Sequence, residues 1–72
     1  MGDPNWEIVA VPVLSVIRET DGAILIETEE AEVWIPKALI KDSSDVNKEG
    51  DSGDLHITRG IAEEKDLYYE EL

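Results

Sequence analysis

Carboxylates are the side chains of this sequence with the greatest capacity for chemistry. The chain of 72 residues carries 18 Asp and Glu against 6 Lys and Arg, a formal net charge of −12. Two carboxylates act as general acid and base only where their surroundings drive their pKa values apart. In this sequence no pair is set apart from the other acids, so a solvated acidic surface explains them equally well.

Nucleophilic and cofactor-dependent catalysis have no motif to support them. The only histidine, His56, falls at an outward position of an expected strand, and no serine lies in a glycine-flanked elbow. The chain has no cysteine, which excludes thiol catalysis and thiolate zinc sites. Gly50 and Gly53 are not followed by the helix and Lys of a phosphate-binding loop. We predict a protein that is not an enzyme and has no cofactor.

The segment 45–56 partly matches a calcium-binding loop. Asp45, Asn47, Glu49 and Gly50 match the first, third and fifth positions and the central glycine of an EF-hand loop. The twelfth position, which should be a bidentate Glu, is His56, and turns also require Asn, Asp and Gly. We therefore predict no metal site. That prediction would be reversed if four side chains placed their oxygen atoms around one point. These are the side chains of Asp45, Asn47, Glu49 and Asp51.

The charge points to a partner with a basic surface. An acidic field repels nucleic acid and anionic membranes, and carboxylates on a rigid domain can imitate a phosphate backbone. We expect a protein partner, with inhibition of a nucleic-acid-binding protein as the specific form. The expected acidic face consists of Glu27, Glu29, Glu30, Glu32, Asp42, Asp45, Glu49, Asp51 and Asp54. The alternative is that these acids only keep the protein dispersed.

Binding of single-stranded nucleic acid is the second functional hypothesis. Small β-barrels bind single strands on aromatic side chains within a basic groove. The residues available for such a groove are Trp34, Lys37, Lys41 and Arg59. Because the net charge opposes this function and the cations do not cluster in sequence, we rank it below a protein partner.

The first half of the chain predicts strands. Residues 6–17 form a long Val- and Ile-rich run that we expect to bend near Pro12. The Asp21-Gly22 step predicts a hairpin into a strand over 23–28. In the strand over 31–35, Val33 and Ile35 share one face and Trp34, expected to be at least half-buried, lies on the other. Pro36 then ends the ladder or marks an edge, and 37–40 suits one helical turn.

The second half predicts a polar loop, one strand and a helix. We expect residues 41–54 to form an acidic loop that buries very little, followed by a strand with Leu55 and Ile57 inward. A helix from Gly60 would present one stripe, with Leu67 outside it. That stripe consists of Ile61, Tyr68 and Leu72, with Ala62 and Tyr69 beside it.

The predicted fold class is mainly β (α+β). It is a small, partly open SH3-like or OB-like barrel, or a meander, of about four strands with a C-terminal helix. Residues 1–5 are expected to be a flexible leader and 6–72 a single domain. No apolar run is long enough to span a bilayer and no signal peptide is evident, so we expect a cytoplasmic protein.

Three segments resemble a group of small phage and prophage proteins. They are Ala23-Ile24-Leu25-Ile26-Glu27, Glu32-Val33-Trp34-Ile35-Pro36-Lys37 and Ile61-Ala62-Glu63-Glu64-Lys65-Asp66-Leu67. The family signature is a strand, a Trp-(Ile/Val)-Pro-Lys-Ser turn and a closing Trp-Leu-Ala helix. The chain departs from it at Ala38, where the family has Ser, and at Gly60, where it often has Trp. The resemblance covers about residues 13–67 and implies a mobile-element context.

Overall fold

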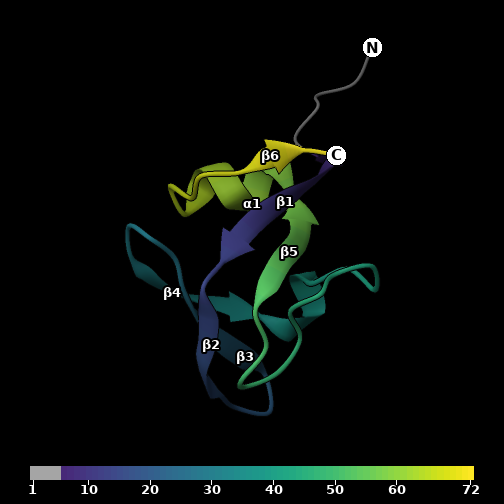
Figure 1. Ribbon diagram of the computed structural model, residues 1–72. Coiled ribbons are helices and arrows are strands. Elements are labelled where there is room, and N and C mark those ends of the chain that lie inside the picture. Colours follow the sequence, from purple (N-terminus) through teal and green to yellow (C-terminus); the bar gives the residue numbers. More distant parts are fainter. Residues whose placement is uncertain (1–5) are drawn as a thin grey trace.

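The chain folds into two three-stranded antiparallel sheets, with strand orders β5-β1-β6 and β2-β3-β4 (Figure 1). The computed structural model describes residues 6–72; the predicted leader, 1–5, lies outside them. The strands are β1 (Ile8–Val13), β2 (Ser15–Glu19), β3 (Ala23–Glu27), β4 (Glu32–Pro36), β5 (Gly53–Thr58) and β6 (Glu70–Glu71). A 3₁₀ turn, η2 (Lys37–Leu39), follows β4, and a short helix, α1 (Arg59–Glu64), follows β5. The predicted mainly β class and partly open barrel are confirmed.

The long first run passes from one sheet to the other. It bends after Pro12 and breaks at Leu14, so that β1 belongs to the first sheet and β2 to the second. The predicted bend is confirmed, and this division is one reason why the sheets contain more than four strands. A second irregularity shifts the β2–β3 register between Val16 and Arg18, which leaves Glu19 opposite Ile24. An extra residue of this kind changes the face to which the following side chains point.

The core lies between the two sheets and consists of β-branched and leucine side chains. Their alternation along each strand is what the sequence predicts, with Leu55 and Ile57 fully buried on β5. On β4, Ile35 is buried and Val33 half-buried, while Glu32 and Trp34 face outward. The buried cluster comprises Val9, Val11, Val13, Val16, Ile24, Ile26, Ile35, Val46, Leu55, Ile57, Ala62 and Leu67.

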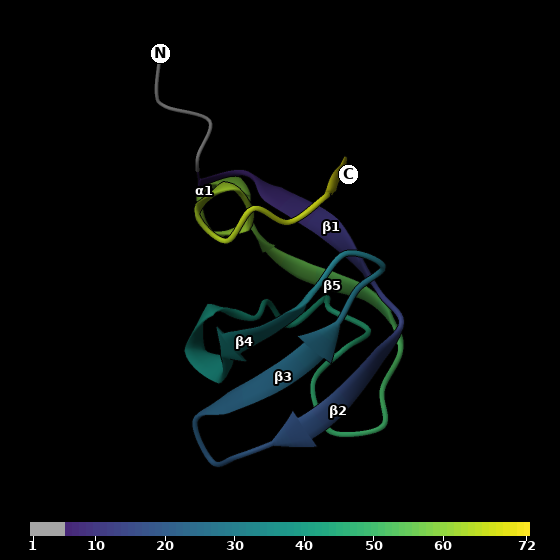
Figure 2. The ribbon, with the colours of Figure 1, turned by 90° about the vertical axis from the view of Figure 1, so that its left-hand side faces the viewer.

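The loop between η2 and β5 closes one side of the barrel. The amides of Lys41 and Asp45 donate to carbonyls of β5, at 2.9 Å each. Further along, Gly50 and Asp51 exchange hydrogen bonds with Val16 of β2, at 2.9 and 2.8 Å. Figure 2 shows this loop running from the end of β4 to the start of β5. It therefore covers the outer edges of both β5 and β2.

The prediction that this loop buries very little is wrong at two positions. Val46 is fully buried in the core, and Ser44 is buried beside it. The Ser44 hydroxyl donates to the Val46 carbonyl at 2.9 Å and accepts from the Val46 amide at 3.1 Å. A single apolar residue among polar ones gives no periodic signal, so the sequence pattern does not reveal this anchor.

The predicted helical stripe at the C-terminus is also wrong. Helix α1 ends at Glu64, Asp66 adopts a left-handed conformation with φ 57°, and the Leu67 amide donates to the Ala62 carbonyl at 2.9 Å. This reversal buries Leu67 and lets β6 pair with the outer edge of β1. Tyr68 and Leu72, assigned to the stripe, are 60% and 72% exposed. Within residues 6–72, no helix is long and apolar enough to cross a membrane.

Candidate functional site

A groove lies between the tip of the β3–β4 hairpin and the segment that follows α1. Its cavity has a volume of about 540 Å³. The apolar part of its wall comes from the β1–β2 corner and from Tyr68, and the hairpin tip supplies two carboxylates. We call this cavity the hairpin groove. It is lined by Pro12, Val13, Leu14, Thr28, Glu29, Glu30, Gly53, Asp54 and Tyr68.

Backbone hydrogen bonds hold both the corner and the hairpin tip in place. The Leu14 amide donates to the Glu27 carbonyl at 2.8 Å, which fixes the corner against the end of β3. At the tip, the Thr28 amide donates to the Ala31 carbonyl at 2.8 Å. The Thr28 hydroxyl oxygen accepts from the amides of Glu30 and Ala31, at 3.2 and 3.1 Å. The groove walls are therefore ordered by local contacts of the kind that Ser and Thr make in turns.

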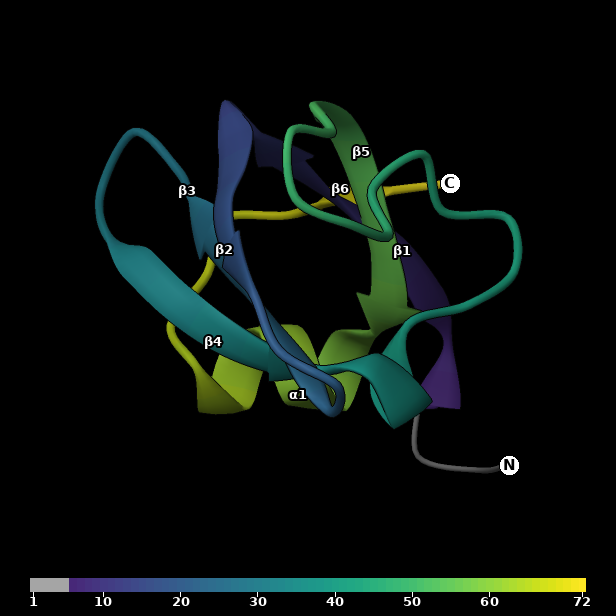
Figure 3. The same cartoon turned by 90° about the horizontal axis from the view of Figure 1, so that it is seen from below.

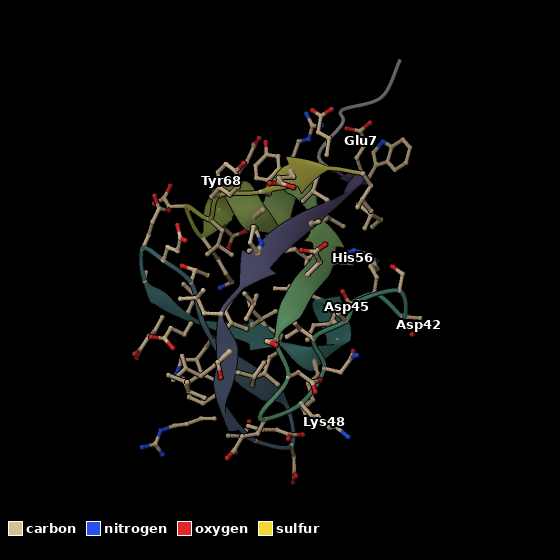
Figure 4. The ribbon with its side chains drawn as sticks, viewed as in Figure 1. Glu7, Asp42, Asp45, Lys48, His56 and Tyr68 are labelled. Carbon is tan, nitrogen blue, oxygen red and sulfur yellow. The ribbon has the colours of Figure 1, made fainter. Side chains whose placement is uncertain are left out.

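Tyr68 is presented to the groove by the reversal at Asp66. Because Leu67 is buried, the next side chain points outward, and Figure 4 shows Tyr68 at the surface of this part of the molecule. Its hydroxyl donates to Oε2 of Glu70 at 3.3 Å. The negative charge of Glu70 and this hydrogen bond raise the pKa of Tyr68. The phenol adds an amphipathic aromatic surface to the groove.

The carboxylates around the groove have no cation beside them in the described chain. Within residues 6–72, ion pairs involve Lys37 and Arg59 and none of the acids of the hairpin. Glu27 and Glu32 also face each other directly across β3 and β4. Like charges in directly opposed positions destabilise a sheet. This side of the molecule therefore carries an uncompensated negative charge next to exposed apolar groups.

The nine acids of the expected face fall into two groups. Glu27, Glu29, Glu30 and Glu32 belong to the hairpin, and Asp54 joins them by lining the groove. The remaining acids lie in the 41–52 loop, part of which projects away from the hairpin tip (Figures 1 and 3), although Asp45 runs beside Asp54 of β5. This second group consists of Asp42, Asp45, Glu49 and Asp51. The hairpin group is the one that the fold brings together with apolar surface.

Several loop acids are engaged in shaping the loop itself. The Asp51 carboxylate accepts from the amides of Asn47 and Lys48, at 2.8 and 3.0 Å, and these hydrogen bonds lower the pKa of Asp51. Asp45 accepts from the amide of Asp54 at 3.4 Å. In the part of the chain that the structure describes, no group of three or more acids or histidines is placed to hold a metal ion. The turn contacts account for the residues that resemble a calcium loop.

The residues of the alternative basic groove are dispersed. Lys37 contacts Glu19 at 2.6 Å, and Arg59 contacts both Glu7 and Glu71, at 2.7 and 2.8 Å. Arg59 also lies over the Tyr69 ring, 5.8 Å from its centroid, and opens α1 near the termini. Trp34 faces outward from the other sheet and, at 43% exposed, is among the exposed large apolar side chains, which differs from the expected buried or half-buried position. Lys41 donates its backbone amide to β5.

One polar pair that sequence reasoning missed joins the loop to β5. Ser43 Oγ lies 2.7 Å from Nδ1 of His56, which Figure 4 places on β5. A Ser–His hydrogen bond is the first part of a nucleophilic triad. Within residues 6–72 no carboxylate hydrogen-bonds His56, and neither residue lines the hairpin groove. No sequence motif links a loop serine to a strand histidine 13 positions away. The contact fastens the loop to β5.

Comparison with protein-family models, with curated proteins and with solved structures finds no match. The resemblance to small phage proteins therefore stays a prediction from the sequence. The hairpin groove has hydrogen-bonded walls, exposed apolar groups and uncompensated acids. These three properties are the basis on which a function is proposed.

Proposed function

We propose that this protein is a non-enzymatic binding module whose hairpin groove accepts a positively charged, partly apolar segment of a partner protein. One observation carries the proposal. The groove places the exposed side chains of Leu14 and Tyr68, 54% and 60% exposed, beside the carboxylates of Glu29, Glu30 and Asp54. Such a surface is complementary to an extended segment in which Leu, Pro or an aromatic residue stands next to Lys or Arg.

The apolar and charged parts of the groove would contribute differently to binding. Burial of Leu14, Pro12 and the Tyr68 ring supplies most of the affinity, because apolar area is worth about 25 cal/mol per Å² removed from water. Each exposed ion pair contributes only about 0.2–1 kcal/mol. The acids chiefly speed association and exclude acidic partners. Affinity should therefore depend on the apolar residue of the ligand, and the association rate on its charge and on salt.

Two more specific expectations from the sequence, inhibition by charge mimicry and a phage or prophage context, are compatible with this proposal. A basic segment of a nucleic-acid-binding protein would satisfy the groove, so an inhibitor that acts by charge mimicry is a specific form of it. The resemblance over residues 13–67 favours a phage or prophage accessory protein. Such a protein would act in the cytoplasm of the host cell. The groove acids, rather than those of the 41–52 loop, are the candidates for contact with the partner.

The test uses a defined peptide and a set of matched variants. An ¹⁵N-labelled sample is titrated with a capped Pro-Leu-Arg-Lys-Leu-Pro peptide and, as a control, with the same peptide carrying Glu for Arg and Lys. We expect the amide signals of Leu14, Glu29 and Tyr68 to shift with the basic peptide only. Double substitution of Glu29→Gln and Glu30→Gln should weaken binding, as should Tyr68→Ala. The controls are Asp21→Asn with Asp42→Asn, which make the same charge change elsewhere, and Trp6→Ala, which removes another exposed aromatic.

Two outcomes would overturn the proposal. If the control pair weakens binding as much as the groove pair, the attraction is a property of net charge and not of the groove. If the basic peptide moves none of the groove signals, the groove is not a binding site for such segments. Labelled single-stranded DNA and RNA are titrated beside the peptides at low salt, where phosphate contacts are strongest. Binding of either nucleic acid that Trp34→Ala abolishes would favour the alternative function.

A further inference from the structure

Strand β4 presents an unused backbone edge. It is the last strand in the order β2-β3-β4, and the Lys37 amide, one residue beyond it, donates to the Gly22 carbonyl at 2.9 Å. In an antiparallel ladder, alternate residues direct their amide and carbonyl to the neighbouring strand. Lys37 bonds toward β3, and so do Ile35 and Val33 by this alternation. The N–H and C=O of Trp34 therefore point to the open side of β4. The same alternation places the backbone of Glu32 on the open side, so Trp34 is the central residue of an edge that could pair with another strand.

The other long edges are covered by the chain itself. The 41–52 loop bonds to the outer edges of β5 and β2, and β6 covers the outer edge of β1. Among the hydrogen bonds of residues 6–72, none besides the ladder with β3 reaches the backbone of Glu32, Val33 or Trp34. Exposed edges are usually short, charged or interrupted by proline, because they invite pairing. Among the longer strands, β4 alone keeps its edge open in this part of the chain.

The side chains of β4 would favour some added strands over others. Glu32 and Pro36 are guarding residues of the common kind, but they flank Trp34, which is 43% exposed and faces outward beside Leu25. An edge that only prevents association has no use for an exposed tryptophan at its centre. On the opposite face, Val33 is only half-buried, so a further strand would complete its burial. Glu32 repels acidic strands, and it faces Glu27 with no cation beside it within residues 6–72.

We infer that β4 accepts an added antiparallel strand from a basic partner segment, with Lys or Arg opposite Glu32 and an aromatic or β-branched residue opposite Trp34. The cation would extend the Glu27–Glu32 row and relieve its repulsion. The ring or branched side chain would cover Trp34, as cross-strand aromatic pairs do. A second copy of this chain is the wrong occupant: each copy carries a charge of −12, and pairing centred on Trp34 would leave Glu32 opposite Pro36. This site is separate from the hairpin groove and does not depend on it.

The test uses the capped peptide acetyl-Thr-Val-Tyr-Val-Lys-Thr-amide, whose Tyr and Lys would lie opposite Trp34 and Glu32. We expect a change in tryptophan fluorescence and slower hydrogen exchange at the Trp34 amide on binding. Methylation of the peptide nitrogen of Tyr removes one of the two hydrogen bonds with Trp34 and clashes with the edge. It should weaken binding about tenfold or more, as expected for one lost bond and an unsatisfied group. This control leaves the protein unchanged, so its folding is not in question.

Protein variants separate this site from the groove and from self-association. Trp34→Pro removes the outward amide and should abolish binding, whereas Trp34→Ala keeps the amide and should retain part of it. Glu32→Gln should remove the preference for the Lys peptide over the same peptide with Glu. Tyr68→Ala, which alters the hairpin groove, should leave the slower hydrogen exchange at the Trp34 amide unchanged. The inference fails if the methylated peptide binds as well as the parent, if neither peptide binds, or if Trp34 becomes protected only as the protein dimerises.

Discussion

Nζ of Lys37 lies 2.6 Å from Oε2 of Glu19, and Oε1 of the same carboxylate accepts the amide of Glu49 at 3.1 Å. One side chain thus connects β2, the turn after β4 and the 41–52 loop. The register shift between Val16 and Arg18 leaves Glu19 opposite Ile24, and from this position its carboxylate reaches both groups. The acidic loop is consequently held to β2 at Glu49, in addition to its buried contact at Val46.

Replacement of Glu19 by Gln should loosen the loop and lower stability slightly at neutral pH. The hydrogen bond from Lys37 and that from the Glu49 amide lower the pKa of Glu19 below its ordinary 4.5. A carboxyl with a lowered folded-state pKa stabilises the fold above its unfolded-state pKa, and that contribution is lost as pH falls through the folded-state value. Because the pair is partly exposed, we expect a small decrease in Tm.

The pH dependence of that decrease is the measurement. Thermal unfolding of wild type and Glu19→Gln is followed by circular dichroism between pH 7 and pH 3. The difference in Tm should be constant near neutrality and shrink below pH 4.5. Glu30→Gln, an exposed hairpin variant, is the control and should show no comparable difference. A gap that persists unchanged at the lowest pH would mean that Glu19 does not act through its charge.

Substitution of Val46 by Ala should destabilise the protein by about 1–3 kcal/mol, as expected for a buried side chain that loses two methyl groups. Val46 is fully buried although it lies in a loop of mostly exposed polar residues. Urea unfolding gives the free energy, and Asp42→Ala in the same loop is the matched control, with an expected change within about 0.5 kcal/mol. Equal effects of the two substitutions would show that the loop does not contribute to the core.

Replacement by Ala should have opposite effects on stability at Gly53 and at Gly22. Gly53 has φ of +124°, and an added Cβ would lie 3.1 Å from Cβ of Asp45, so Gly53→Ala should cost about 1–3 kcal/mol. At Gly22 nothing lies within 4 Å and φ is not in the left-handed region, so Gly22→Ala should be neutral or stabilise by up to about 1 kcal/mol. Urea midpoints of the two variants provide the comparison. A tolerated alanine at Gly53 would contradict the backbone conformation described at the start of β5.

The strands could be predicted from the sequence because apolar and polar side chains alternate when one face of a strand is buried and the other is exposed. Ile24 and Ile26, Leu55 and Ile57 follow the period of two, and Asp21-Gly22 marks the hairpin between β2 and β3. The hairpin groove could not be predicted in this way. Its lining comes from four separate segments, and the place of Tyr68 in that lining depends on a reversal at Asp66 that no local signal marks. The sequence pattern predicts the hairpin acids but not the apolar side chains that line the same groove.

The C-terminal segment shows that hydrophobic periodicity does not account for long-range backbone pairing. A helical stripe favours Tyr68 and Leu72 as buried residues, yet the chain leaves the helix at Glu64 and buries Leu67. The β1 edge offers a continuing chain two backbone pairing positions, at Val9 and Ala10. Those long-range hydrogen bonds compete with further helical turns in a segment already rich in acids. A short helix gains most of its stability from packing, so a better tertiary partner ends it.

Leu67 and Leu72 therefore provide a matched test of this reversal. Leu67 is 7% exposed and its amide closes the turn after α1, so Leu67→Ala should cost about 2–4 kcal/mol by removing buried volume. Leu72 is 72% exposed, and Leu72→Ala should change stability by no more than about 0.5 kcal/mol. Urea unfolding ranks the two variants, and hydrogen exchange at Glu70 and Glu71 reports whether β6 stays paired. If Leu72→Ala were the more damaging change, the segment would instead continue as the helix that the sequence pattern favours, and the groove wall built on Tyr68 would not form.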